Sequence, residues 1–387
     1  MTEPVAVQTM TTERPSGRSF LPDLLKAVGC VLIVLHHLAF YGPMSDVVDE
    51  HWPMLIDGLA DHGRLAVQVF LVCSGYLTAV SFARDAQMDT RRLVLLAWRR
   101  YLRLSVPLLA ALSLTVLISE LIRPGFDHPS LSAPPDVMQA LAHVLLLQHL
   151  LDWEALSAGV WYVAIDFQLY LMALLALWGV SRWVHWQPDR PADVLRLQVV
   201  LVLTFLSLMR WNLNTDMDMY GLYFFGAYGL GWLAWRTRQS QIPLKGWAGL
   251  VALGLLAWLV DSRLRIMTAW LVAMLLATAP QSWMQVRHFS DGPRRAIGWL
   301  AGISYSVFVI HFGVSLAVSA LVTQWWPQSL VGNMGGMAVS LLASILAGAC
   351  LHRWTERRAP SAKQWLFWVG VFMASTILAM NWASASD

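Results

Sequence analysis

Eleven stretches of mostly apolar residues, each close to the length that crosses a lipid bilayer, dominate this chain of 387 residues. A helix needs about 20 such residues to span the hydrocarbon core, because each residue advances it by only about 1.5 Å. With 57% hydrophobic and 13% charged residues, the chain also has more apolar side chains than a soluble fold can bury. The sequence therefore predicts an all-α, polytopic membrane helix bundle of about eleven transmembrane helices. The predicted spans are residues 20–41, 65–83, 101–122, 160–180, 194–211, 219–235, 246–261, 264–280, 296–320, 330–352 and 363–383.

The positions of Lys and Arg predict the orientation, because these residues are enriched in cytoplasmic loops. With the N-terminus inside, 22 of the 27 lie on the inner side. The polar residues 1–17 are then a cytoplasmic tail, in which we expect no cleaved signal peptide. An odd number of spans then predicts that the C-terminus lies outside. The apolar run 137–150 is too short for a span and predicts an interfacial or re-entrant helix. Five arginines remain on the outer side: Arg64, Arg123, Arg210, Arg263 and Arg265.

Charge and cysteine content argue against a nucleic-acid partner and against a disulfide framework. A net charge of +3 is too small to indicate a nucleic-acid partner. Cys30, Cys73 and Cys350 all lie in apolar stretches, so they predict no disulfide framework. We expect neither a metal site nor a bound cofactor.

The first span carries ionisable residues along one face. Lys26 and His37 are eleven residues apart, which places them about 16.5 Å apart along the axis and within about 20° of the same face. His36 points elsewhere. A buried ionisable group in a membrane helix is costly, so this stripe suggests a polar pathway. Alternatively, Lys26 snorkels to the cytoplasmic interface. Three further residues share the stripe: Asp23, Cys30 and Ile33.

Two later spans also carry such groups. In the fourth, Asp166 is four residues from both Tyr162 and Tyr170, so a carboxylate lies between two phenols on one face. A carboxylate at this depth requires a partner. In the ninth span, Ser304 and His311 share a face, although a single histidine there is often only a hydrogen bond between helices.

Two other segments have simpler interpretations. The Ser74-Gly75 pair of the second span is typical of close helix approach. Glu356, near the inner membrane surface, is placed to pair with inner-loop arginines in a purely structural role.

Taken in order, these motifs resemble the acyltransferase 3 family of integral-membrane O-acyltransferases. The similarity covers about residues 18–360, which we take as the membrane acyltransferase domain; residues 361–387 add one helix and a short outer tail. The acidic position of the fourth span is usually Glu in the family and is Asp166 here. The resemblance rests on six segments: Lys26…His37, with Lys in place of the commoner Arg; Phe70…Ser74-Gly75-Tyr76; Arg99-Arg100-Tyr101-Leu102-Arg103 up to Pro107; Trp161-Tyr162 up to Tyr170; Ser304-Tyr305-Ser306 up to His311; and Glu356.

The resemblance implies transfer of an acyl group, most often acetyl, from acyl-CoA on the cytoplasmic side to a hydroxyl. Acyl-CoA is then a co-substrate, and the acceptor is a carbohydrate or glycolipid of the cell surface or one that is exported. The implied location is the plasma or inner membrane. The oligomeric state is not predicted.

The residues suggest a mechanism for this reaction. A neutral His37 is a suitable general base, because imidazole titrates near neutral pH. Asp166 is a candidate for orienting it, and His311 is a second candidate for proton transfer. Arginines of the inner loop suit the phosphates of coenzyme A, although the positive-inside rule explains them without a ligand. The expected substrate-binding residues are Lys26, Arg99, Arg103, Ser74, Tyr76, Tyr162, Tyr170, Tyr305 and Glu356.

Other possibilities stay open at this point. A covalent acyl-enzyme is not required, but four residues offer a hydroxyl for one: Ser74, Ser304, Ser306 and Tyr305. The intramembrane Lys, His and Asp also suit a proton-coupled transporter, which would be marked by matched interrupted helices in two halves, or a glycan flippase. Hydrolysis of acyl-CoA would separate the enzyme from both.

Overall fold

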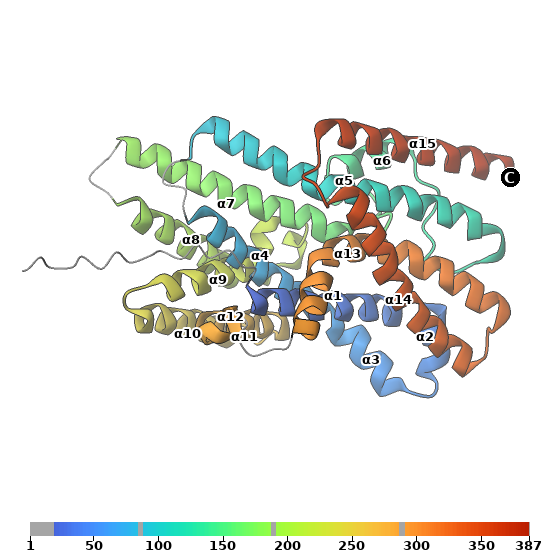
Figure 1. The fold of residues 1–387 in the computed structure, drawn as a ribbon, viewed down its shortest axis with the longest axis horizontal. Coiled ribbons are helices and arrows are strands. Elements are labelled where there is room, and N and C mark those ends of the chain that lie inside the picture. Colours follow the sequence, from blue (N-terminus) through green and yellow to red (C-terminus); the bar gives the residue numbers. More distant parts are fainter. Residues whose placement is uncertain (1–18, 84–87, 187–190, 286–290, 387) are drawn as a thin grey trace, which may run out of the picture.

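The computed structural model describes residues 19–83, 88–186, 191–285 and 291–386, and the predicted N-terminal tail lies outside them. Helices joined by short turns and loops make up this part of the chain, with no strand in it (Figure 1). The helices are α1 (Phe20–Tyr41), α2 (Pro43–Asp49), α3 (Pro53–His62), α4 (Ala66–Phe82), α5 (Thr90–Ile122), α6 (Val137–Val144), α7 (Val160–Trp186), α8 (Ala192–Met209), α9 (Gly221–Gln239), α10 (Pro243–Val260), α11 (Leu264–Thr278), α12 (Gln281–Gln285), α13 (Asp291–Trp325), α14 (Leu330–Thr355) and α15 (Ala362–Ser386).

The all-α polytopic bundle is confirmed, whereas the count of eleven spans is not. In the described part of the chain, nine helical segments are long and apolar enough to cross a membrane. The other two predicted spans are helices too. However, α11 has 15 residues, so it is only about 22 Å long, and the glycine-rich α9 ends in Arg236 and Arg238. Because α9 packs among α4, α7, α8, α10 and α11, it does not need an apolar surface facing lipid.

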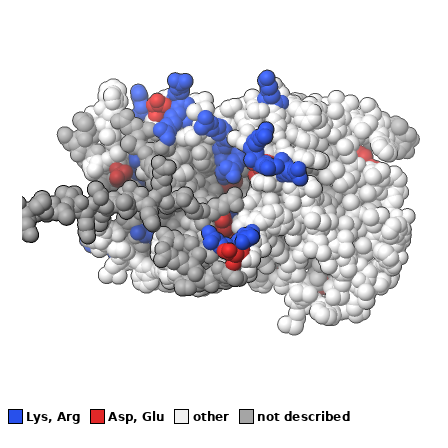
Figure 2. All heavy atoms as spheres, in the orientation of Figure 1, with Lys and Arg blue, Asp and Glu red and all other residues white. Residues whose placement is uncertain are grey.

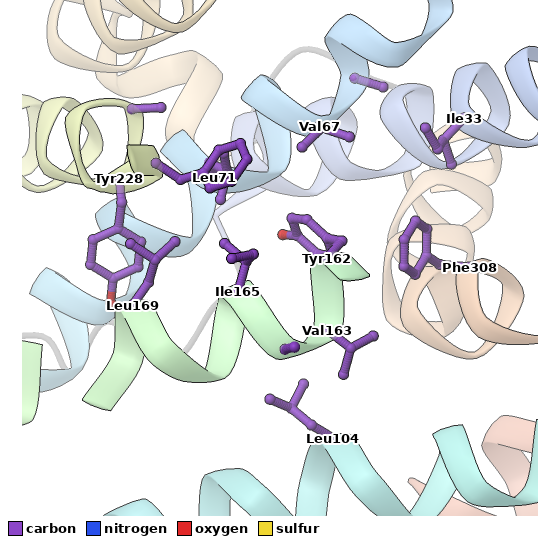
Figure 3. Packing of buried hydrophobic residues seen from close by; sticks show 14 of the residues in the cluster. Ile33, Val67, Leu71, Leu104, Tyr162, Val163, Ile165, Leu169, Tyr228 and Phe308 are labelled. Atoms are coloured by element: carbon purple, nitrogen blue, oxygen red, sulfur yellow. The ribbon is translucent and has the colours of Figure 1, made fainter. Parts of the chain in front are cut away.

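The centre of the bundle is built from α1, α4, α5, α7, α9 and α13, which form one continuous apolar core. In Figure 3, Leu71 of α4, Leu169 of α7 and Tyr228 of α9 meet in this core. Such burial removes apolar side chains from solvent and fixes how the helices face one another.

The small residues of the second span do bring two helices together. A Cβ atom added at Gly75 would lie 1.8 Å from the carbonyl oxygen of Tyr228, and one at Gly231 would lie 1.9 Å from that of Val72. The backbones of α4 and α9 therefore touch at a distance that only glycine permits. This contact confirms the packing interpretation of that segment.

The apolar run 137–150 forms the short helix α6 followed by turns, which pack beside α15. His143 is fully buried there. Its Nδ1 lies 2.8 Å from the carbonyl oxygen of Gln139, and its Nε2 accepts a hydrogen bond from the Leu156 amide at 3.1 Å. Both contacts suit the neutral ring, and burial lowers the pKa of His143 to about 4.

Charged residues are unevenly spread over the surface. On the face drawn in Figure 2, Lys and Arg gather where α5 begins and where α14 meets α15, whereas the end that carries α2 and α3 is almost free of them. By the positive-inside rule, the start of α5 is the side predicted to face the cytoplasm.

Candidate active site

A cavity of about 460 Å³ opens between the first turns of α5 and the end of α14, on the side predicted to be cytoplasmic. We call it the inner cavity. Helices α1, α4, α7 and α13 complete its wall. It brings together nine of the residues that the sequence singled out: Lys26, Ser74, Arg99, Arg103, Tyr162, Asp166, Tyr170, Tyr305 and Glu356.

The carboxylate of Asp166 lies in the wall of this cavity and is only 4% exposed. Its Oδ1 accepts a hydrogen bond from the Ser74 hydroxyl at 2.9 Å, and its Oδ2 forms an ion pair with Arg100. The Arg100 guanidinium also lies over the Tyr170 ring, 5.1 Å from its centre. The partner that this carboxylate requires is therefore Arg100, which also lines the inner cavity.

Arg100 is a site residue that the predicted set left out. The sequence shows three arginines in the stretch 99–103, but it does not show which of them turns toward α7. Helix geometry separates Arg99 from Arg100 by about 100°. As a result Arg100 is half-buried against Asp166, whereas Arg99 and Arg103 remain exposed at the mouth of the cavity.

Two other predicted residues are held by specific hydrogen bonds. The Tyr305 hydroxyl donates to the backbone carbonyl of Leu104 at 2.6 Å, which ties α13 to α5. Glu356 accepts a hydrogen bond from Ser306, and its Oε1 lies 3.6 Å from Nδ1 of His352. The partners described for Glu356 are thus on α13 and α14, in place of the inner-loop arginines considered for it.

Tyr76 is the predicted binding residue that does not line the inner cavity. It is 4% exposed and belongs to the apolar core. It follows Gly75, at which α4 touches α9. The Tyr76 side chain therefore packs between helices, although its position in the motif had predicted a binding role.

His37 and His311 form a pair, although α1 and α13 are far apart in the sequence. Nδ1 of His37 lies 2.6 Å from Nε2 of His311, and the rings are stacked with an angle of 5° between them. Nδ1 of His311 lies 2.6 Å from the carbonyl oxygen of Phe308, which can only accept a hydrogen bond. In the neutral pair, His311 therefore donates from Nδ1 and accepts at Nε2, so His37 donates from Nδ1. The lone pair that this leaves is on Nε2 of His37.

Burial distinguishes the two histidines. His311 is fully buried, whereas His37 is 8% exposed. His36 lies on another face, as expected, with its Nδ1 3.1 Å from the Leu59 carbonyl oxygen. The pair can therefore accept a proton at His37, with His311 holding the ring in place.

Asp166 does not contact His37 in the structure: its partners are Ser74 and Arg100, and the side chain that contacts His37 is His311. An aromatic partition lies between the inner cavity and the histidine pair, made of Phe70, Tyr162 and Phe308. Phe308 lies 5.3 Å from Tyr162 and 6.1 Å from His311 between ring centres, and Figure 3 shows Tyr162 of α7 and Phe308 of α13 in the same region of the core. All three partition residues line the inner cavity. The sequence marks Phe70 and Tyr162 as parts of motifs, but nothing in it marks Phe308 as their neighbour.

Within the described residues, no group of three or more His, Cys, Asp or Glu side chains is arranged to hold a metal ion. The three cysteines are free thiols there: Cys30 and Cys73 are buried and Cys350 is exposed. The polar side chains that line the inner cavity are basic, phenolic, hydroxyl-bearing and acidic, the acidic ones being Asp166 and Glu356.

Comparison with known families agrees with this geometry. A family model for the acyltransferase 3 domain matches residues 21–380, from the start of α1 into α15. No curated protein and no solved structure shows a significant match. Because the matched range covers nearly the whole chain and includes the inner cavity and both histidines of the pair, this protein belongs to the acyltransferase 3 family.

Proposed function

We propose that this protein transfers an acyl group, acetyl in the simplest case, from acyl-CoA in the cytoplasm to a hydroxyl of a carbohydrate or glycolipid acceptor. It does so as a multi-pass protein of the plasma or inner membrane with its N-terminus inside. One observation supports this proposal above the others. His37, which pairs with His311 and keeps a lone pair on Nε2, is separated by the Phe308 ring from the inner cavity, whose mouth carries exposed arginines.

The inner cavity suits the acyl-CoA donor in both its parts. Arg99 and Arg103 are exposed at its mouth, where they can contact the pyrophosphate and 3′-phosphate groups of coenzyme A. Lys26 adds a further cation to the lining. Deeper in, the lining becomes aromatic, with Phe70 and Phe308 at its end, and suits the uncharged pantetheine arm and the thioester.

In the chemical step, Nε2 of His37 accepts the proton of the acceptor hydroxyl while the oxygen attacks the thioester carbonyl carbon. The carbon–sulfur bond then breaks, and the thiolate of coenzyme A leaves and takes up the proton. The products are the acyl ester and free coenzyme A. His311 is a positioning residue: it accepts from Nδ1 of His37 and so keeps the lone pair on Nε2.

The two substrates meet at the aromatic partition. Because Phe308 separates the inner cavity from His311, the thioester reaches His37 only if this ring turns aside. In the resting position it keeps water in the inner cavity away from the base, which protects the thioester from hydrolysis.

The test uses membrane vesicles with labelled acetyl-CoA and compares the wild type with His37→Ala. We expect the wild type to transfer label to water or to a co-extracted glycan, and His37→Ala to lose this activity by about 100-fold or more. His36→Ala is the matched control, since His36 lies on another face and contacts Leu59. It should keep its activity.

His311→Gln should fall between these two variants, because it leaves His37 present but without its fixed tautomer. Equal turnover by the wild type and His37→Ala would exclude His37 as the base. Absence of turnover with any acyl-CoA, native acceptor included, would favour a transporter.

A further inference from the structure

A second cavity of about 860 Å³ lies at the first turns of α4 and α7, with the loops before α9 and α11. We call it the outer cavity, because these ends are predicted to face outward. It shares none of its lining residues with the inner cavity. Three of the five arginines assigned to the outer side line it: Arg64, Arg263 and Arg265.

Arg263 and Arg265 lie side by side in its wall. Both guanidinium groups donate to the same backbone carbonyl oxygen, that of Asn212. Arg265 also lies over the Tyr223 ring, 4.7 Å from its centre. Two like charges are therefore held together at a partly buried position, an arrangement that disfavours both charged forms unless an anion offsets them.

The carboxylates nearby only partly offset these charges. Asp261 forms an ion pair with Arg263 at 2.8 Å. In the described part of the chain, no carboxylate lies within ion-pairing distance of Arg265, and its buried Nε has no hydrogen-bond partner. Burial and then the neighbouring Arg265 lower the pKa of Arg263, while Asp261 opposes this shift. Asp61 and Asp218 also line the outer cavity, but among the described residues neither forms an ion pair with Arg263 or Arg265, so Arg265 has no carboxylate as a direct partner.

An aromatic side chain lines this cavity, and the cavity wall packs against the helix that carries His37. Trp161 lines it and packs edge-on against Tyr162 of the aromatic partition, 6.2 Å between ring centres. Gly63 lies between two lining residues and against α1: a Cβ atom there would come within 2.7 Å of Cβ of His36. The outer cavity therefore rests on the turn of α1 that carries His37.

We propose that the outer cavity binds an anionic group of the acceptor, a carboxylate or a phosphate, through Arg263 and Arg265, with a sugar ring on Trp161. Paired guanidinium groups match the planar or tetrahedral oxygens of such groups better than lysines would. The proposal rests on the proposed function in one respect, that the bound molecule is the acyl acceptor. The binding itself is independent of it.

The test measures the thermal unfolding temperature of the purified protein in detergent, with coenzyme A at saturating concentration. If coenzyme A binds the basic mouth of the inner cavity, as the proposed function has it, added anions report on the outer cavity. The probes are glucuronate as a carboxylate, glucuronamide as its neutral counterpart, and inorganic pyrophosphate as a phosphate. The variants are Arg263→Gln and Arg265→Gln, with Arg210→Gln as the control, because Arg210 is an exposed outer arginine that does not line the cavity.

We expect a saturable rise in the unfolding temperature of the wild type and of Arg210→Gln with glucuronate or pyrophosphate, and none with glucuronamide. The better of the two anions identifies the source of the charge. In Arg265→Gln the apparent Kd should rise by about tenfold or more. Stabilisation by coenzyme A shows that a variant is still folded.

The proposal is overturned if neither anion stabilises the wild type more than glucuronamide does, a comparison that needs no variant. It is also overturned if both arginine variants bind the anion as the wild type does. Acyl transfer measured on the same preparation separates the two proposals: transfer without anion binding refutes only this one, and anion binding without transfer refutes the acceptor role and the proposed function.

Discussion

Replacing Asp166 by Asn will leave Arg100 without its counter-charge in the wall of the inner cavity. The side chains of Asp166 and Arg100 are 6% and 25% exposed. Removing one partner of a fully buried ion pair costs about 3–5 kcal/mol. Because solvent reaches a quarter of Arg100 and offsets part of the loss, we expect about 2–3 kcal/mol here. Asn keeps an oxygen that can accept from Ser74, so the change removes mainly charge.

A double-mutant cycle isolates the pair. Arg100→Gln alone strands the Asp166 carboxylate and should cost as much as Asp166→Asn, whereas the double variant should cost little more than either. The coupling is then about 2 kcal/mol. Unfolding of the detergent-solubilised protein by denaturant measures all four proteins. Arg99→Gln, at the exposed neighbouring position, should change stability by less than about 0.5 kcal/mol.

Kinetics decide whether Asp166 acts only by holding Arg100. If it does, Asp166→Asn raises the KM for acyl-CoA, because the inner cavity loses its shape, and lowers kcat less. Additive losses in the double variant would refute the ion-pair reasoning. Unchanged stability and donor KM together with lost turnover would instead place Asp166 at the reacting atoms.

Three further predictions concern other parts of the molecule. Because the pKa of His143 is low, the folded state binds fewer protons than the unfolded state below about pH 6.5. The free energy of unfolding should therefore fall by roughly 3 kcal/mol as the pH drops from about 6.5 to 4. Thermal unfolding of His143→Gln at the same pH values should show a smaller fall, and an equal fall would contradict this assignment. Gly231→Ala should cost about 2 kcal/mol or more, because its Cβ would collide with the Val72 carbonyl. Gly249→Ala, with open space around it, should be neutral or stabilising in the same unfolding assay. Arg103→Gln should raise the KM for acyl-CoA about tenfold with kcat nearly unchanged, and Arg103→Lys should recover part of this; an unmoved KM in steady-state kinetics would remove Arg103 from donor binding.

The family and the fold class could be predicted from the sequence because they depend on local features. The length and apolar content of each segment predict helices in a membrane, and helix periodicity places Lys26 and His37 on one face. The motifs carry the family resemblance for the same reason. Nearly all predicted binding residues line one cavity, and because they come from several helices, the packing of these helices brings them together.

The number of membrane spans was harder to predict from the sequence, because it depends on the neighbours of each helix. The glycine-rich α9 is long enough to cross a membrane but packs among five other α-helices, so its composition differs from that of a lipid-facing span. Tyr76 was assigned to binding for a related reason: a motif position does not reveal whether its side chain faces a cavity or a packed helix.

Which groups touch was decided by the tertiary structure alone. His37 and His311 are 274 residues apart, and nothing local specifies that their rings stack or which nitrogen keeps its lone pair. The same holds for Arg100 and Asp166, and for Arg263 and Arg265 meeting at the carbonyl of one residue. Sequence periodicity determines the face of a helix on which a residue lies, whereas the partner on that face depends on how the helices pack in three dimensions.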